Sequence, residues 1–300
     1  MHNFVFMLKS FSEDVLYVER LLKSYHSFNK DKIPLYIVVP IKDLNIFSKF
    51  KNNSIEIIEE ESITPYLVND NSVWGIRPGY INQQIIKLAF WETGICKNYL
   101  CLDSDAEFIR DFFIHDFMYN LETPFSILVE DNELAVDPEY FKEYWISRSK
   151  RLEIIKRALG LEDIRTLTCH NMTIFSLKVM RSFNNKFLKM KRYSYIDILK
   201  IAPCEFAWYN FWLQKDNAIQ VMFREPLFKM FHNKSQHIEY LKKGITIKDI
   251  ARGYLGIVIN SNYSRGYGVI SYDSKKPYTT SLMKRIFRKI KRIFYTNIWN

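Results

Sequence analysis

Apolar runs alternate with helically patterned stretches over the first forty residues. Asn3 to Leu8 is almost wholly apolar, and Pro34 to Pro40 is a second apolar run that begins and ends with proline. Both runs predict buried strands. From Asp14 to Ser24, apolar residues instead recur at helical spacing. Strand, helix and strand in this order predict the opening of a parallel sheet.

The same alternation continues to residue 259. Further strands are predicted at 54–59, 99–102, 125–129, 173–177 and 255–259, and helices at 79–94, 138–159 and 182–211. The sequence contains no internal repeat or low-complexity linker before Ser274. We therefore expect one α/β domain over residues 1–273, with a mixed, mostly parallel, Rossmann-like sheet flanked by helices.

The composition fits one soluble globular domain. Apolar residues make up 48% of the 300 residues and charged residues 25%, so the chain can bury a sizeable core. The four cysteines form no CxxC pair and indicate reduced thiols. Neither a secretory signal nor an apolar stretch of membrane-spanning length is predicted. These features favour a cytoplasmic protein.

Basic residues are concentrated at the C-terminus. The net charge is +10, yet residues 274–300 carry eight Lys and Arg and no acid, which leaves residues 1–273 at only +2. The body of the chain is therefore nearly neutral, and we do not expect it to bind nucleic acid. Affinity for nucleic acid depends on clustered cations that contact phosphates.

The tail has the pattern of an interfacial helix. At about 100° per residue, residues 282–298 separate into two faces. The apolar face holds Leu282, Met283, Ile286, Phe287, Ile290, Ile293, Phe294 and Ile298, and the opposite face holds Lys284, Arg285, Arg288, Lys289, Lys291 and Arg292. We expect residues 274–300 to form a membrane-associating tail that lies on the anionic inner face of the cytoplasmic membrane. The alternative is a helix docked on its own domain.

The strongest chemical signal is an acidic triplet after a buried strand. Tyr99 to Leu102 is apolar and is followed by Asp103-Ser104-Asp105. Ligands of open parallel sheets bind beyond the carboxyl ends of the strands, where both carboxylates would meet. Hard oxygen ligands suit Mn²⁺ or Mg²⁺, which commonly bridge substrate phosphates. The alternative is a solvated turn.

Several blocks together resemble a known group of enzymes. Gly75, Tyr80, Gln83-Gln84 and Lys87, followed by residues 99–105, are similar to bacterial GT-A glycosyltransferases of a poorly characterised group found in surface-polysaccharide loci. The opening strands and the segment 204–209 also match, so the resemblance covers about residues 3 to 262. The first strand departs from the group, because it ends in Lys9-Ser10 instead of a Pro-Thr-Tyr-like turn.

The resemblance implies a GT-A-like fold, a nucleotide-sugar donor and a bound Mn²⁺ or Mg²⁺. Asp103 and Asp105 would hold the metal and the ribose-diphosphate. The further candidates for contacting the nucleotide are Lys9, Gln84 and Lys87. An ammonium near a diphosphate neutralises charge, although Lys87 on a solvated helix face is the alternative.

Glu205 is the candidate catalytic base or acceptor-binding carboxylate. It precedes an aromatic stretch that contains Phe206, Trp208 and Tyr209, and apolar neighbours favour a carboxyl group that accepts protons. A base is required if the enzyme inverts the anomeric centre, whereas retention would leave Glu205 to bind the acceptor. The sequence leaves both open, together with a third role as a helix cap after Pro203.

The remaining site residues are weaker candidates. GT-A enzymes often add a late histidine to the metal ligands, and His232 is preferred here over His170 and His237. The acidic pair at 130–131 would line the acceptor side, and residues 260–262 would close over the donor.

The sequence therefore predicts a glycosyltransferase that extends a surface glycan (capsule, O-antigen or lipooligosaccharide), with a glycan or lipid-linked acceptor. The rival functions are a phosphohydrolase or a nucleotidyltransferase that uses the acidic triplet, and a non-enzymatic carbohydrate- or nucleotide-binding module. The donor sugar, the base, the acceptor and the stereochemical course are not encoded in the spacing.

Overall fold

A computed structural model of the chain describes residues 1–71, 73, 75–129, 135, 138–164, 167–168, 172–261 and 272. The strands are β1 (His2–Lys9), β2 (Leu35–Val39), β3 (Ile55–Glu59), β4 (Cys96–Leu102), β5 (Ala106–Phe108), β6 (Phe125–Ser126), β7 (Ile174–Ser176), β8 (Met222–Phe223), β9 (Phe228–Phe231) and β10 (Gly256–Ile259). The helices are α1 (Val15–Phe28), α2 (Leu44–Phe47), α3 (Glu60–Ile63), α4 (Pro78–Ala89), α5 (Pro138–Leu159), α6 (Leu177–Phe183), α7 (Lys189–Lys191), α8 (Tyr195–Ile201), α9 (Glu205–Asp216), α10 (Lys234–Lys242) and α11 (Ile247–Ile250).

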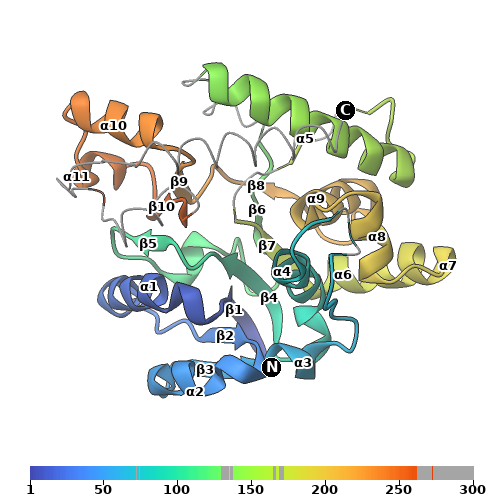
Figure 1. Cartoon of the computed structure of the whole chain (residues 1–300), viewed down its shortest axis with the longest axis horizontal. Coiled ribbons are helices and arrows are strands. Elements are labelled where there is room, and N and C mark those ends of the chain that lie inside the picture. The colour runs from blue at the N-terminus through green and yellow to red at the C-terminus, as the bar shows by residue number, and fades with distance from the viewer. Residues whose placement is uncertain are drawn as a thin grey trace.

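The main sheet has five strands in the order β3-β2-β1-β4-β7 (Figure 1). β3, β2, β1 and β4 run parallel, and β7 is antiparallel to β4. The chain adds β2 and β3 on one side of β1 and β4 on the other. The strand order therefore reverses between β1 and β4, and the carboxyl ends of these two strands form the switch point at which open α/β sheets bind ligands.

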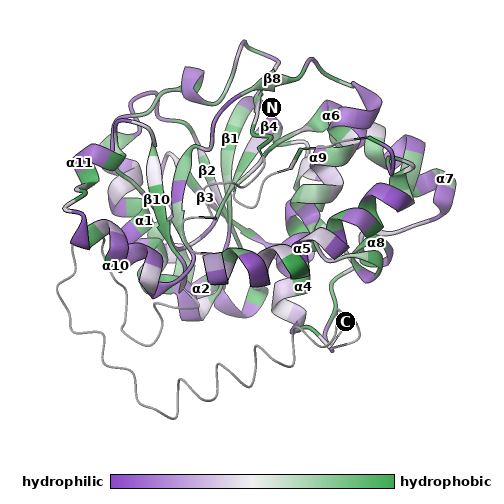
Figure 2. Cartoon of the chain, turned by 90° about the horizontal axis from the view of Figure 1, so that it is seen from above, coloured by the Kyte–Doolittle hydropathy of each residue, from purple (hydrophilic) through white to green (hydrophobic). Residues whose placement is uncertain are grey.

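Strand alternation divides the core into two layers. Phe4, Phe6 and Leu8 of β1 pack with α1, whereas Val5 and Met7 point to the opposite face and pack with α4 and α9. Successive side chains of a strand point to opposite faces, so a strand covered by helices on both faces is apolar throughout. Figure 2 shows the hydrophobic strands between α1 on one side and α9 on the other.

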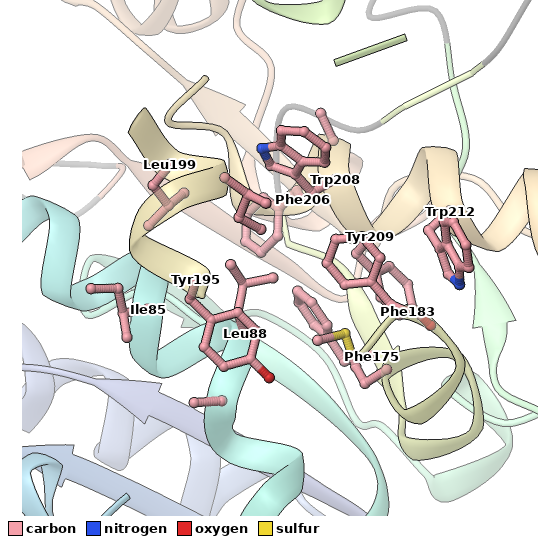
Figure 3. Close-up of a cluster of buried hydrophobic side chains, with 14 of the residues drawn as sticks. Ile85, Leu88, Phe175, Phe183, Tyr195, Leu199, Phe206, Trp208, Tyr209 and Trp212 are labelled. Atoms are coloured by element: carbon pink, nitrogen blue, oxygen red, sulfur yellow. The ribbon is translucent and has the colours of Figure 1, made fainter. Parts of the chain in front are cut away.

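Aromatic side chains fill the layer between the sheet and the helices α4, α6, α8 and α9 (Figure 3). The Trp208 indole N–H donates to the carbonyl oxygen of Ala202 at 2.9 Å, and the Tyr209 hydroxyl accepts from the backbone N–H of Ser176 at 2.9 Å. The polar tip of each buried ring is therefore hydrogen-bonded. The first bond ties α9 to the end of α8 and the second ties it to β7, so together they set the position of the N-terminus of α9.

A second, smaller sheet stands beside the first in the order β5-β10-β9. β10 runs antiparallel to β5 and parallel to β9, and α10 and α11 pack against this sheet. β5 begins immediately after the acidic triplet. The amino end of β5 therefore meets the carboxyl ends of β9 and β10.

The long helix α5 crosses above the strands in Figure 1. Its buried residues are Leu152, Ile155 and Leu159, all in its second half, where it packs on α9. Its first half carries Trp145 and Ile146, which are exposed. Buried apolar contacts therefore hold the second half of α5, whereas the first half contributes no buried residue.

The predicted α/β architecture is confirmed: the sheet is mixed and mostly parallel, with helices on both faces. Two details were wrong. The strand predicted at 125–129 is only Phe125–Ser126 long, and the helix predicted at 182–211 is interrupted, with Arg192 in the left-handed region at φ 56°. β5 and β9 were not predicted, because a charged residue, Glu107 in β5 and Lys229 in β9, interrupts each short apolar run. No helix among the described residues is long and apolar enough to span a membrane. The predicted tail helix at 282–298 lies outside the described residues.

Candidate functional site

β1 and β4 end side by side at the switch point. Leu8 is in register with Leu102, so the next residues, Lys9 and Asp103, are neighbours on the face that carries α4. One residue further, the Ser104 hydroxyl donates to the Ser10 hydroxyl at 3.1 Å. The acidic triplet therefore lies where the fold predicts a ligand.

Lys87 joins two of the predicted site residues. Its Nζ lies 3.1 Å from Oδ1 of Asp103 and 3.2 Å from Oε1 of Glu205, and its side chain is 4% exposed. The carbonyl oxygen of Lys87 accepts from the Tyr99 hydroxyl at 2.7 Å, which ties α4 to β4. Burial disfavours the ammonium, but the two carboxylates outweigh burial and hold the pKa of Lys87 above its ordinary value. Lys87 therefore stays charged, and it is not a solvated helix-face lysine.

Asp105 is buried at the start of the second sheet. Its Oδ2 accepts from the backbone N–H of Ser261 at 2.6 Å, and its carbonyl oxygen accepts from Arg20 at 2.9 Å. Burial, and then the carboxylate of Asp103, raise the pKa of Asp105 to about 7, although the Ser261 N–H opposes this. Ser261 follows β10, so the segment expected to close over the donor does contact the acidic triplet.

Glu205 is the first residue of α9, and Cys204 is the N-cap. The Cys204 side chain makes no cap hydrogen bond, and the Glu205 carboxylate is directed to Lys87. A carboxylate in the first turn is stabilised by the helix dipole. The apolar setting expected for Glu205 is provided by Phe206, whose ring lies 4.6 Å from Nζ of Lys87.

Lys9 is buried and has its own partner. Its Nζ lies 2.6 Å from Oε2 of Glu60 and donates to the carbonyl oxygen of Ser10 at 2.8 Å. Glu60 begins α3 directly after β3, so this ion pair also lies at the carboxyl edge of the sheet. The sequence reasoning missed Glu60, although its place after a predicted strand was a usable signal.

Gln84 is buried on α4, one turn before Lys87. Its neighbour Gln83 is only half-buried, which resolves which of the two glutamines faces inward. The α4 helix therefore brings both nucleotide candidates, Gln84 and Lys87, to the inner layer.

His232 follows β9 and packs against α5. Its ring centroid lies 5.1 Å from that of Tyr140 and 6.1 Å from that of Tyr144. Within the described ranges, no group of three or more His, Cys, Asp and Glu side chains could hold a metal ion. The structure thus does not gather His232 with the two aspartates into one ligand set.

Of the alternative histidines, His237 is fully buried, and its Nε2 lies 2.8 Å from the carbonyl oxygen of Tyr272. This contact gives His237 a place in the core. His170 and the acidic pair at 130–131 lie outside the described residues.

Comparison with known proteins gives one family match. The model of a family of unknown function, DUF6492, matches residues 7–248. No curated protein matches the chain.

Two solved structures have a similar chain path. Mouse xyloside xylosyltransferase 1 in its apo form is 10% identical in sequence to this chain, with a TM-score of 0.48. The match spans 87% of this chain and 98% of the mouse protein chain. The galactosyltransferase LgtC, in complex with donor and acceptor sugar analogues, is 12% identical in sequence to this chain, with a TM-score of 0.47. The match spans 93% of this chain and 98% of the LgtC chain. At these scores no residue role is transferred from either protein.

Proposed function

We propose a function for this chain, which belongs to DUF6492, a family of unknown function: it is a GT-A-type glycosyltransferase that moves a sugar from a nucleotide-sugar donor to a glycan. One observation carries the proposal. Two carboxylates, Asp103 and Asp105, stand at the carboxyl end of β4, at the switch point of the sheet, beside the buried ammonium of Lys87. Anionic ligands with a divalent cation are the ligands that this combination suits.

The donor set fits Mn²⁺ or Mg²⁺. Such ions are commonly held by one or two carboxylates together with substrate phosphates and water. Asp105 is buried close to Asp103, and like charges so placed are costly without a cation. When bound by these two residues, the metal would offset the charge of the leaving diphosphate. His232 is kept as a candidate third ligand that donor binding would have to bring nearer.

The remaining charged residues divide between the donor and the acceptor. Lys87 supplies a fixed positive charge where negative charge grows on the leaving diphosphate, and its two carboxylate partners hold it there. Lys9 sits at the end of β1 on the nucleotide side, oriented by Glu60. Glu205 faces the acceptor, either as the base that takes the hydroxyl proton or as the group that positions that hydroxyl.

The acceptor and its location follow from the sequence of the tail. We infer that residues 282–298 bind an anionic membrane surface at the cytoplasmic face, and that the acceptor is a growing, lipid-linked surface glycan. Confinement to the membrane would raise the effective concentration of enzyme and acceptor.

The test is a thermal-shift panel of UDP, GDP, CMP and their common sugar conjugates, with and without Mn²⁺. We expect one nucleotide to raise the melting temperature only with metal, and Asp105→Asn to abolish that shift. Asp111→Asn is the matched control, because Asp111 is exposed and pairs with Lys30 on the surface. A folded wild-type protein that responds to no nucleotide would overturn the proposal.

A further inference from the structure

One face of α4 carries polar side chains on a helix whose other faces are mostly apolar. Tyr80, Gln84 and Lys87 are four and three residues apart. At 100° per residue, Gln84 lies about 40° from Tyr80 and Lys87 about 20° on the other side of it. The three side chains therefore form one row along α4.

The C-terminal end of this row faces Glu205, because Nζ of Lys87 lies 3.2 Å from Oε1 of Glu205. Helical side chains tilt toward the N-terminus of their helix, and the N-terminus of α4 lies at the carboxyl edge of the parallel sheet because α4 leads back to the start of β4. Gln84 lies between Tyr80 and Lys87 along the row, about one turn from Lys87.

Gln84 is the one member of the row whose polar atoms are unsatisfied. The residue is 1% exposed, and neither its Oε1 nor its Nε2 has a hydrogen-bond partner in the described part of the chain. An unsatisfied buried amide is costly, and a ligand that completes its hydrogen bonds offsets this cost. By comparison, the buried Asn82 of the same helix is satisfied by the backbone N–H and carbonyl of Val68.

We propose that the Gln84 amide binds hydroxyl groups of the transferred sugar. The inference rests on the proposed function and assigns a residue that binds the sugar of its donor. The glutamine amide has hydrogen-bond donors on Nε2 and an acceptor in Oε1, so it matches hydroxyl groups, which both donate and accept. A diphosphate only accepts hydrogen bonds and would leave Oε1 without a donor.

Gln84→Leu separates this role from a structural one. In the ligand-free protein, removing an unsatisfied amide is expected to raise the melting temperature by about 3 °C. The same variant is expected to weaken binding of a nucleotide hexose, such as UDP-glucose or GDP-mannose, by about 10- to 100-fold, measured by calorimetry with Mn²⁺. Binding of the matching free diphosphate, UDP or GDP, is expected to change by less than about twofold.

Gln83→Leu is the matched control, because it makes the same substitution at the half-buried neighbouring position. Gln83→Leu should change the affinity neither for the diphosphate nor for the nucleotide sugar. Gln84→Met should show the same loss of nucleotide-sugar binding as Gln84→Leu. Equal losses for diphosphate and sugar conjugate, or no loss at all, would overturn the inference and leave the transferase proposal standing. If the wild type binds no nucleotide, both proposals fall.

Discussion

Lys87→Met is expected to lower the free energy of unfolding by about 3–5 kcal/mol and to abolish donor binding. The substitution keeps the apolar stem, so the loss comes from the charge. Without the ammonium, the carboxylates of Asp103 and Glu205 would remain close together, and Glu205 would be a buried charge with no counterion. Removing one partner of a buried ion pair is strongly destabilising for this reason.

Urea denaturation at pH 7.5 measures this effect. Lys178→Met is the control, since Lys178 pairs with Glu122 on the exposed surface, where an ion pair contributes less than about 1 kcal/mol. Adding Glu205→Gln to Lys87→Met should restore about 1–3 kcal/mol, because it removes the stranded charge. A Lys87→Met protein as stable as the Lys178→Met protein would contradict the bridging role.

In the absence of metal, Asp105 is expected to make the protein less stable as the pH rises from about 4 to 7. The pKa of Asp105 is about 7 in the folded protein and near the ordinary aspartate value of 3.8 when the chain is unfolded. Within this window the folded state binds more protons than the unfolded state, so stability falls as the proton is lost. The full difference corresponds to at most about 4 kcal/mol.

The measurement is the free energy of unfolding of wild type and Asp105→Asn at pH 4.5, 6 and 7.5 in the presence of a chelator. The difference between the two curves isolates Asp105 from other titrating groups. The free energy of unfolding of Asp105→Asn should rise relative to that of the wild type as the pH rises. Mn²⁺ should remove this difference at pH 7.5, because only the wild type binds the ion there. Parallel curves would show that Asp105 is ionised throughout the range.

Local pattern was enough to predict the frame of the site. β1, β2 and β4 are apolar runs long enough to be recognised, and the position of Asp103 at the end of β4 follows from that pattern alone. Helical spacing likewise placed Lys87 on the helix before that strand. These predictions depend on neighbours close in the sequence, which is where periodicity is informative.

The partners of the charged residues needed the three-dimensional structure. The parallel pairing of β1, β2 and β3 brings Lys9 to Glu60, and the packing of α9 on the sheet brings Glu205 to Lys87. No spacing rule encodes the contact of Lys87 with Glu205, more than a hundred residues away. β5 and β9 were missed for a related reason, since Glu107 and Lys229 interrupt their short apolar runs and the two strands are stabilised by pairing with β10.

The uneven anchoring of α5 has a consequence for its amide hydrogen exchange. Backbone amides in the first half of the helix, around Trp145, are expected to exchange much sooner than those around Ile155, because apolar burial protects only the second half. The first half includes Tyr140 and Tyr144, which pack on His232. Partial unwinding from that end would release His232 while Leu152, Ile155 and Leu159 stay in place. The free energy of that local opening, well below that of global unfolding, would set how often the histidine is uncovered.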